Sequence, residues 1–174
     1  MNKIELGKLI YKAAYLTGEF LLRSGKISNE YFDKYQFEAN PVLLKEISIQ
    51  MSDMIIANKY DGLAALEMGG IPIATAISLQ TGLPIVFVRK KAKEYGTRRV
   101  AEGMEIADKK LLVIEDVVTS GGQIILSVQD LRNAGVIVED ALCVIDRLQG
   151  GKENLSNANI SLSSLFTIDE LKSY

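Results

Sequence analysis

The segment LLVIEDVVTSGGQ, residues Leu111–Gln123, decides the fold of this chain. An apolar run leads into the adjacent carboxylates Glu115 and Asp116, and a turn of small residues, 119–122, follows two valines. A strand that is apolar on both faces is typical of a parallel sheet covered by helices. The segment therefore predicts a buried strand and a strand-to-helix turn, which is where open α/β sheets bind ligands.

The residue types in this segment indicate which ligand would fit there. Small residues let backbone N–H groups point inward, and the positive end of the following helix favours a phosphate. The two carboxylates would repel a phosphate, so they need hydroxyl donors or a cation as partners. A ligand with a phosphate and a diol meets both demands, and ribose 5-phosphate is the simplest one. The alternative is a solvated strand end before an ordinary turn.

The rest of the chain alternates between predicted strands and helices. Strands are expected at 62–66, 83–88, 111–115, 136–147 and 160–166, and helices at 3–17, 40–58, 71–82, 123–133 and 167–172. Residues 20–37 predict two extended pieces around a Ser-Gly turn, and 149–159 predict a loop. This pattern predicts a single α/β domain over 1–174, with an open, mostly parallel sheet flanked by helices.

Composition excludes several classes of function. The net charge of −2 gives no general attraction to nucleic acid, and no apolar run is long enough to cross a membrane. The absence of histidine removes common metal clusters and every Ser-His or Cys-His nucleophile. The single cysteine, Cys143, lies in the apolar run ALCVI and is expected to be a buried thiol. We therefore expect a cytoplasmic protein with neither nucleic acid nor membrane as partner.

The segment LLVIEDVVTSGG resembles the phosphoribosyl-pyrophosphate (PRPP) signature of the type I phosphoribosyltransferases. Within them the chain resembles the orotate phosphoribosyltransferases, through FLLRSGKISNEYFD (20–33), ALEMGGIPIA (65–74), VFVRKKAKEYGT (86–97) and VIDRLQGG (144–151). The resemblance implies transfer of ribose 5-phosphate from PRPP to N1 of orotate, giving orotidine 5′-monophosphate and pyrophosphate in UMP biosynthesis. It also implies Mg²⁺ as cofactor, a homodimer with shared active sites, and a hood of 1–40 plus the C-terminal end over a core of 41–150.

The resemblance also implies a role for individual residues. The PRPP-binding set is Arg89, Lys90, Lys93, Tyr95, Glu115, Asp116, Val117, Val118, Thr119, Ser120, Gly121, Gly122 and Gln123. The orotate-binding set is Arg23, Lys26, Tyr31, Phe32, Thr119 and Arg147. Lys93, Glu115 and Asp116 are implied to be catalytic, and Mg²⁺ would arrive with PRPP near the two carboxylates. Read without the resemblance, 89–110 could be a solvated charged loop, Tyr31 and Phe32 core residues, and Asp146–Arg147 a surface pair.

The chain departs from the family pattern at three places. Many members have histidine where Tyr95 stands, Tyr-Lys where Met68-Gly69 stands, and aspartate where Glu115 stands. The second departure removes a cation from the loop expected to meet pyrophosphate. Two alternatives therefore stay open: a phosphoribosyltransferase for another base, and a PRPP-sensing regulatory paralogue. Residues 93–107 are expected to form a mobile lid that reaches into the partner's site.

Overall fold

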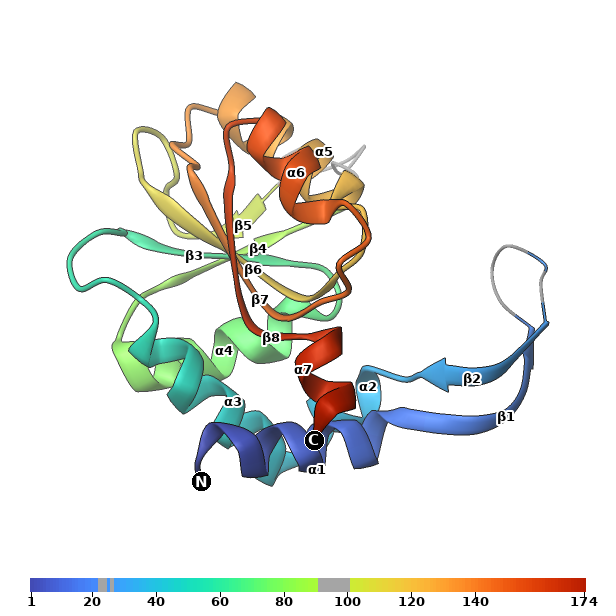
Figure 1. Ribbon diagram of the computed structural model, residues 1–174. Coiled ribbons are helices and arrows are strands. Elements are labelled where there is room, and N and C mark those ends of the chain that lie inside the picture. Colours follow the sequence, from blue (N-terminus) through green and yellow to red (C-terminus); the bar gives the residue numbers. More distant parts are fainter. Residues whose placement is uncertain (22–24, 26, 91–100) are drawn as a thin grey trace.

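The computed structural model describes residues 1–21, 25, 27–90 and 101–174 (Figure 1). Its helices are α1 (Lys3–Ala14), α2 (Tyr35–Glu38), α3 (Pro41–Asp53), α4 (Gly70–Thr81), α5 (Gly122–Asn133), α6 (Gly151–Asn157) and α7 (Ile168–Ser173). Its strands are β1 (Tyr15–Leu21), β2 (Ile27–Phe32), β3 (Gly62–Leu66), β4 (Ile85–Val88), β5 (Ala101–Gly103), β6 (Leu111–Val118), β7 (Asp140–Asp146) and β8 (Ser161–Thr167).

Six of these strands form one sheet in the order β5-β4-β3-β6-β7-β8. Every pair in it is parallel except β4–β5, which is antiparallel. The order changes direction at β3 and β6, the two central strands, so their carboxyl ends border the same crevice. The predicted open, mostly parallel sheet is confirmed.

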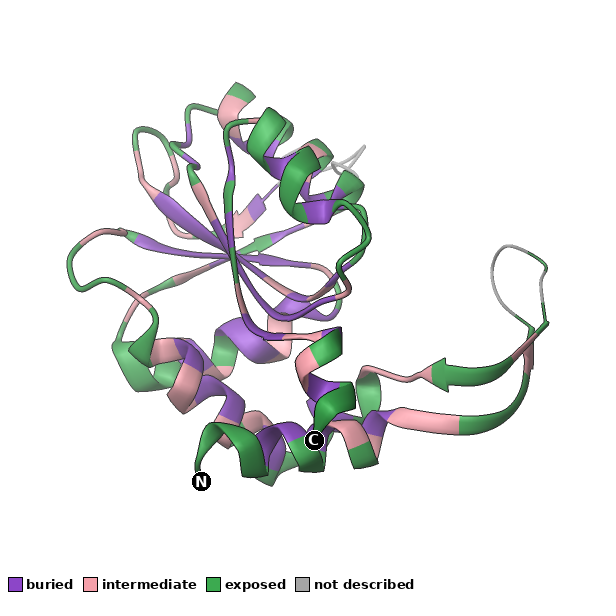
Figure 2. Ribbon diagram, in the orientation of Figure 1, coloured by how far each residue is buried: buried purple, intermediate pink, exposed green. Residues whose placement is uncertain are grey.

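Two apolar cores lie on opposite faces of this sheet. One packs α1, α3 and α4 against one face, and the other packs α5 and α6 against the opposite face. Figure 2 shows the resulting buried positions along the central strands. Cys143 on β7 belongs to the second core with none of its surface exposed, which confirms the prediction of a buried thiol.

The remaining elements gather on one side of the sheet. The β1–β2 hairpin projects from the end of α1, and α7 packs against α1 near the two chain ends (Figure 1). A Cβ on Gly7 of α1 would stand 2.5 Å from the ring of Tyr174, so the two termini are closely packed. The division of the chain into a hood and a core stays a prediction. Among the described residues, no helix is long and apolar enough to cross a membrane.

Several predicted boundaries were wrong. Helix α1 ends at Ala14, three residues early, and α3 ends at Asp53 rather than near residue 58. A short helix, α2, occupies 35–38, where an extended piece was expected. The predicted loop 149–159 contains α6, which buries Leu155. This segment is polar around that one leucine, so it shows no apolar face at the sequence level.

Candidate functional site

The acidic pair lies inside β6 rather than at its end, because the strand continues to Val118. Asp116 is 1% exposed, and its backbone N–H donates to Glu115 Oε1 at 3.0 Å. The N–H of Val117 in turn donates to Asp116 Oδ1. Burial, followed by the negative charge of Asp116, raises the pKa of Glu115 well above its ordinary value. Two negative charges are therefore disfavoured at this pair, and a hydroxyl donor or a cation would relieve the repulsion.

Two residues that sequence reasoning missed contact this pair from α2 and its N-cap. Lys34 Nζ lies 2.5 Å from Asp116 Oδ2. Burial lowers the pKa of Lys34, but the hydrogen bond and charge of Asp116 outweigh it, and the net shift is upward. Glu38 is 7% exposed, and burial together with the charge of Asp116 raises its pKa to about 8. Its Oε1 has no hydrogen-bond partner in the described part of the chain.

The turn after β6 leads directly into the start of a helix. Gly121 has φ of 76° and caps α5, and a Cβ there would stand 3.0 Å from Leu155 Cγ. Asn154 Nδ2 of α6 donates to the carbonyl of Ser120 at 2.9 Å, which fixes the turn from the side. A 12-residue helix begins at Gly122, so its first N–H groups and positive end border the turn. Phosphate binding at this turn stays a prediction.

The loop after β3 lies directly against the acidic pair. Glu67 Oε1 accepts the backbone N–H of Lys90 at 2.6 Å, and the Glu67–Met68 peptide bond is cis. A Cβ on Gly69 would stand 1.3 Å from Asp116 Oδ2. A Cβ on Gly70 would stand 2.3 Å from the carbonyl oxygen of Ile114. Only glycines fit this approach, so the loop and β6 form one continuous wall.

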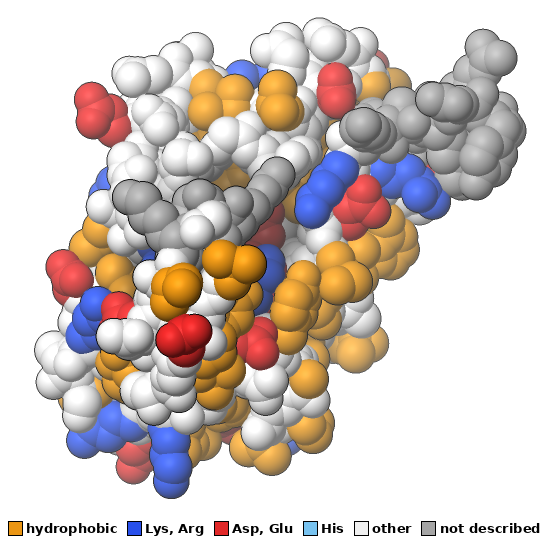
Figure 3. Space-filling model, turned by 90° about the vertical axis from the view of Figure 1, so that its right-hand side faces the viewer, with side chains coloured by type: hydrophobic (Ala, Val, Ile, Leu, Met, Phe, Trp, Pro, Cys, Tyr) orange, Lys and Arg blue, Asp and Glu red, His pale blue; other side chains and the backbone are white. Residues whose placement is uncertain are grey.

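These parts enclose a cavity of about 450 Å³ at the carboxyl ends of the central strands. It is lined by the predicted residues Tyr31, Phe32, Lys90, Glu115, Asp116, Val117, Thr119, Gln123 and Arg147. It is also lined by Lys34 and Tyr35, which carried no prediction, and by Glu67, Met68 and Gly69 of the loop expected to meet pyrophosphate. Figure 3, seen from the side of the hairpin, shows acidic and basic side chains together in the hollow of this face.

Other predicted residues lie elsewhere. Those that do not line the cavity are Arg89, Val118, Ser120, Gly121 and Gly122. Arg23, Lys26, Lys93 and Tyr95 lie outside the described residues, as does most of the predicted lid. The missed residues had little signal in the sequence, because a lysine beside an aspartate at 33–34 looks like any polar turn.

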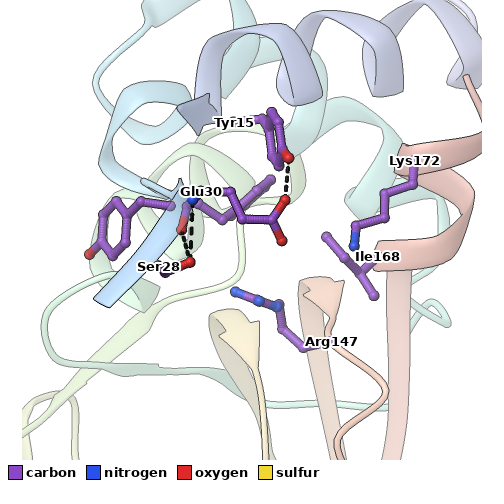
Figure 4. Close-up of a pocket in the computed structure, with 8 residues that line it drawn as sticks. Tyr15, Ser28, Glu30, Arg147, Ile168 and Lys172 are labelled. Carbon is purple, nitrogen blue, oxygen red and sulfur yellow. Dashed lines mark hydrogen bonds between the residues drawn. The ribbon is translucent and has the colours of Figure 1, made fainter. Parts of the chain in front are cut away.

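A second cavity, of about 300 Å³, shares Tyr31, Phe32 and Arg147 with the first (Figure 4). Its other lining residues are Tyr15, Ser28, Glu30, Ile168 and Lys172. The hydroxyl of Tyr15 donates to Glu30, and this hydrogen bond raises the pKa of Tyr15 to about 12.

Arg147 stands between the two cavities. Its guanidinium carbon lies 5.9 Å from the centre of the Phe32 ring, and its buried Nε has no partner among the described residues. Among the described residues Asp146 forms no ion pair with Arg147, and Asp146 Oδ1 accepts the N–H of Leu148 at 2.8 Å. Arg147 is half-buried, lines both cavities and has an unpartnered Nε, so it favours an anionic ligand over the surface-pair interpretation.

Comparison with known proteins identifies the family of the chain. Residues 35–169 match the phosphoribosyl transferase domain family. The chain is 45% identical to the orotate phosphoribosyltransferase of Nocardioides sp. (strain ATCC BAA-499 / JS614), over 90% of this chain and 87% of that relative. It is 41% identical to the orotate phosphoribosyltransferase of Methanocaldococcus jannaschii, over 90% and 88% of the two chains.

A solved structure gives the same result for the fold. The crystal structure of Mycobacterium tuberculosis H37Rv orotate phosphoribosyltransferase in complex with Fe(III) dicitrate matches with a TM-score of 0.87 and 27% identity. The match covers 97% of this chain and 98% of that one. The chain therefore belongs to the phosphoribosyltransferase family, and within it to the orotate phosphoribosyltransferases.

Proposed function

We propose that this chain transfers ribose 5-phosphate from PRPP to orotate, releasing pyrophosphate and forming orotidine 5′-monophosphate in pyrimidine biosynthesis. One observation carries the proposal. A single cavity is lined by a buried acidic pair, by Thr119 and Gln123 of the turn after β6, and by Arg147 together with Tyr31 and Phe32. These three features suit the diol, the 5-phosphate and the base of the reactants.

Each reactant group has a proposed place in this cavity. The 5-phosphate would bind the N–H groups at the start of α5, and the ribose hydroxyls would donate to Glu115 and Asp116. Arg147 would meet the orotate carboxylate through its two-pronged guanidinium, with Tyr31 and Phe32 beside the ring. Positive charge develops on the sugar as the bond to pyrophosphate breaks, so fixed charges and positioning would supply most of the rate.

We propose that Mg²⁺ is the cofactor and that it arrives bound to PRPP. Carboxylate oxygens are preferred ligands of Mg²⁺, and Glu115 and Asp116 supply them at the cavity wall. No group of three or more acidic or sulfur ligands that could hold a metal occurs in the described ranges. This supports a metal held partly by substrate phosphates, where it would neutralise the leaving group. Chelation of Mg²⁺ should abolish turnover and weaken PRPP binding, and full activity in chelator would contradict the proposal.

The decisive experiment measures turnover with PRPP, Mg²⁺ and one of orotate, uracil, adenine or hypoxanthine. Orotate alone should react. Arg147→Ala should raise the orotate KM by about 10- to 100-fold, the value of one charged two-pronged contact, with little change in the PRPP KM. Lys45→Ala, an exposed position on α3, serves as the control and should change neither constant. Equal increases in the two KM values for Arg147→Ala would argue against a carboxylate-bearing base.

We also propose a homodimer in which Lys93 acts as a catalytic cation in the partner's site. A mixture of Lys93→Ala and Asp116→Ala chains tests both parts. Each variant alone should be nearly inactive, while mixed dimers should recover activity because one of their two sites is intact. No recovery in dimers shown to be mixed would place Lys93 in its own chain's site. A chain that stays monomeric while fully active would contradict the dimer.

A further inference from the structure

Lys34 is a cation of the candidate site that neither the family signature nor the sequence pattern identifies. It lies at the N-cap of α2, and its side chain reaches Asp116, 82 positions later in the chain. We propose that Lys34 binds the pyrophosphate group of PRPP and supplies the positive charge that position 69 lacks. The proposal rests on the proposed function and adds a binding residue to it.

The space around Gly69 carries the first step. Asp116 Oδ2 occupies the place where a Cβ at position 69 would stand, at 1.3 Å. A longer side chain at this position therefore cannot coexist with Asp116 as it is placed. The ammonium group of Lys34 lies 2.5 Å from the same Oδ2 atom, so it stands beside the space that such a side chain would enter. The charge reaches this spot from α2 instead of from the loop.

The hydrogen-bonding capacity of Lys34 carries the second step. An ammonium group has three N–H donors. Within the described ranges, its one hydrogen-bond acceptor is Asp116. The lysine side chain is 34% exposed and lines the cavity that also contains Lys90 and Gly69. Lys34 can therefore keep Asp116 and still donate to a phosphate oxygen that enters the cavity.

The charge balance carries the third step. Lys34 stands among three carboxyl groups, those of Asp116, Glu115 and Glu38, of which only Asp116 pairs with it. When the diol and Mg²⁺ satisfy the acidic pair, the ammonium loses part of its counter-charge. The pyrophosphate, which gains negative charge as its bond to the ribose breaks, is then the strongest acceptor within reach.

Calorimetry with three ligands tests the proposal: Mg·PRPP, Mg·pyrophosphate and ribose 5-phosphate. Lys34→Gln should lower the affinity for PRPP and for pyrophosphate by about 10- to 100-fold, as expected for the loss of one charged hydrogen bond. Ribose 5-phosphate, which has the diol and the 5-phosphate but no pyrophosphate, should bind as before. Lys34→Arg should keep most of the PRPP affinity, and Lys45→Gln, at an exposed position of α3, should change nothing.

Two results would overturn the proposal. If the affinities for ribose 5-phosphate and PRPP fell equally, Lys34 would only hold Asp116 in place. If the PRPP affinity stayed unchanged, Lys34 would not be a binding residue. Because Lys34→Gln leaves buried acids without a counter-charge, circular dichroism must show that it is folded. If it is not, the same comparison is made between Glu38→Gln and Glu38→Gln/Lys34→Gln. Wild-type chain that binds PRPP but turns over no orotate would refute the proposed function while leaving this test intact.

Discussion

The carboxyl ends of β6 and β3 adjoin each other, yet they contribute to the site in different ways. In the last half of β6 and directly after it, nearly consecutive residues provide the acidic pair, the turn and the start of α5. After β3, the loop provides only close backbone approach at Gly69 and Gly70, and the nearby charge comes from Lys34 on another element. One side of the site is thus built from a contiguous motif, and the other side is built from residues that are far apart in the sequence.

The largest effect is expected from a substitution at Asp116, where the ends of β6 and β3 meet. Asp116→Asn removes the charge that holds Lys34 and one acceptor for the diol, so kcat/KM for PRPP should fall about 100-fold or more. Asp140→Asn is the matched control, because Asp140 pairs with Lys59 at 2.7 Å at the amino end of β7. Steady-state kinetics of both variants check this, and similar losses in both would mean a general effect on the sheet.

A smaller effect is expected from filling the space at β3. Gly69→Ala places a Cβ 1.3 Å from Asp116 Oδ2, so the carboxylate must rotate away from its position and from Lys34. Displacing one site group should raise the PRPP KM about tenfold or more. Leu79→Ala changes a side chain of α4 that is 84% exposed and lies outside the cavity, and it should leave the KM unchanged. A normal KM for Gly69→Ala would show that the contact between the two strand ends has no role in binding.

The smallest effect concerns stability at the junction. The pKa of Glu38 is about 8 in the folded chain against an ordinary value of 4.5, so between these values the folded chain holds a proton that the unfolded chain has lost. Stability contributed by this group is therefore full at low pH and is lost as pH rises toward 8. Glu38→Gln stays neutral at every pH. Its melting temperature should therefore lie a few degrees above that of the wild type near pH 8 and close to that of the wild type near pH 5. Melting curves that stay parallel across this range would show that Glu38 is ionised in the folded chain.

The sequence predicted the sheet and the β6 half of the site because their signals are local. An apolar run, an acidic pair and a turn of small residues stand next to each other in 111–123, and each restricts the backbone by itself. The strand is longer than predicted because Glu115 and Asp116 look like a strand end, whereas one is partly buried and the other fully buried.

The β3 half of the site could not be predicted in this way. The contact between Lys34 and Asp116 joins residues 82 positions apart, and no periodic pattern records such a pair. Leu155 is similar, because a single apolar residue within a polar segment gives no helical period, although it anchors α6 beneath Gly121. Local patterns determine the strands and turns, whereas packing between distant elements determines where charged side chains such as Lys34 lie.

Cys143 gives the chain an internal label. Its thiol lies on β7 beside Glu115 of β6 with no exposed surface, and burial raises its pKa well above the ordinary value. A thiol reagent can therefore modify only molecules whose sheet has opened. A ligand that binds the closed form makes opening rarer in proportion to its occupancy, so the rate of labelling falls as the ligand is added. The affinity of each substrate can thus be read from one sulfur atom, without any measurement of turnover.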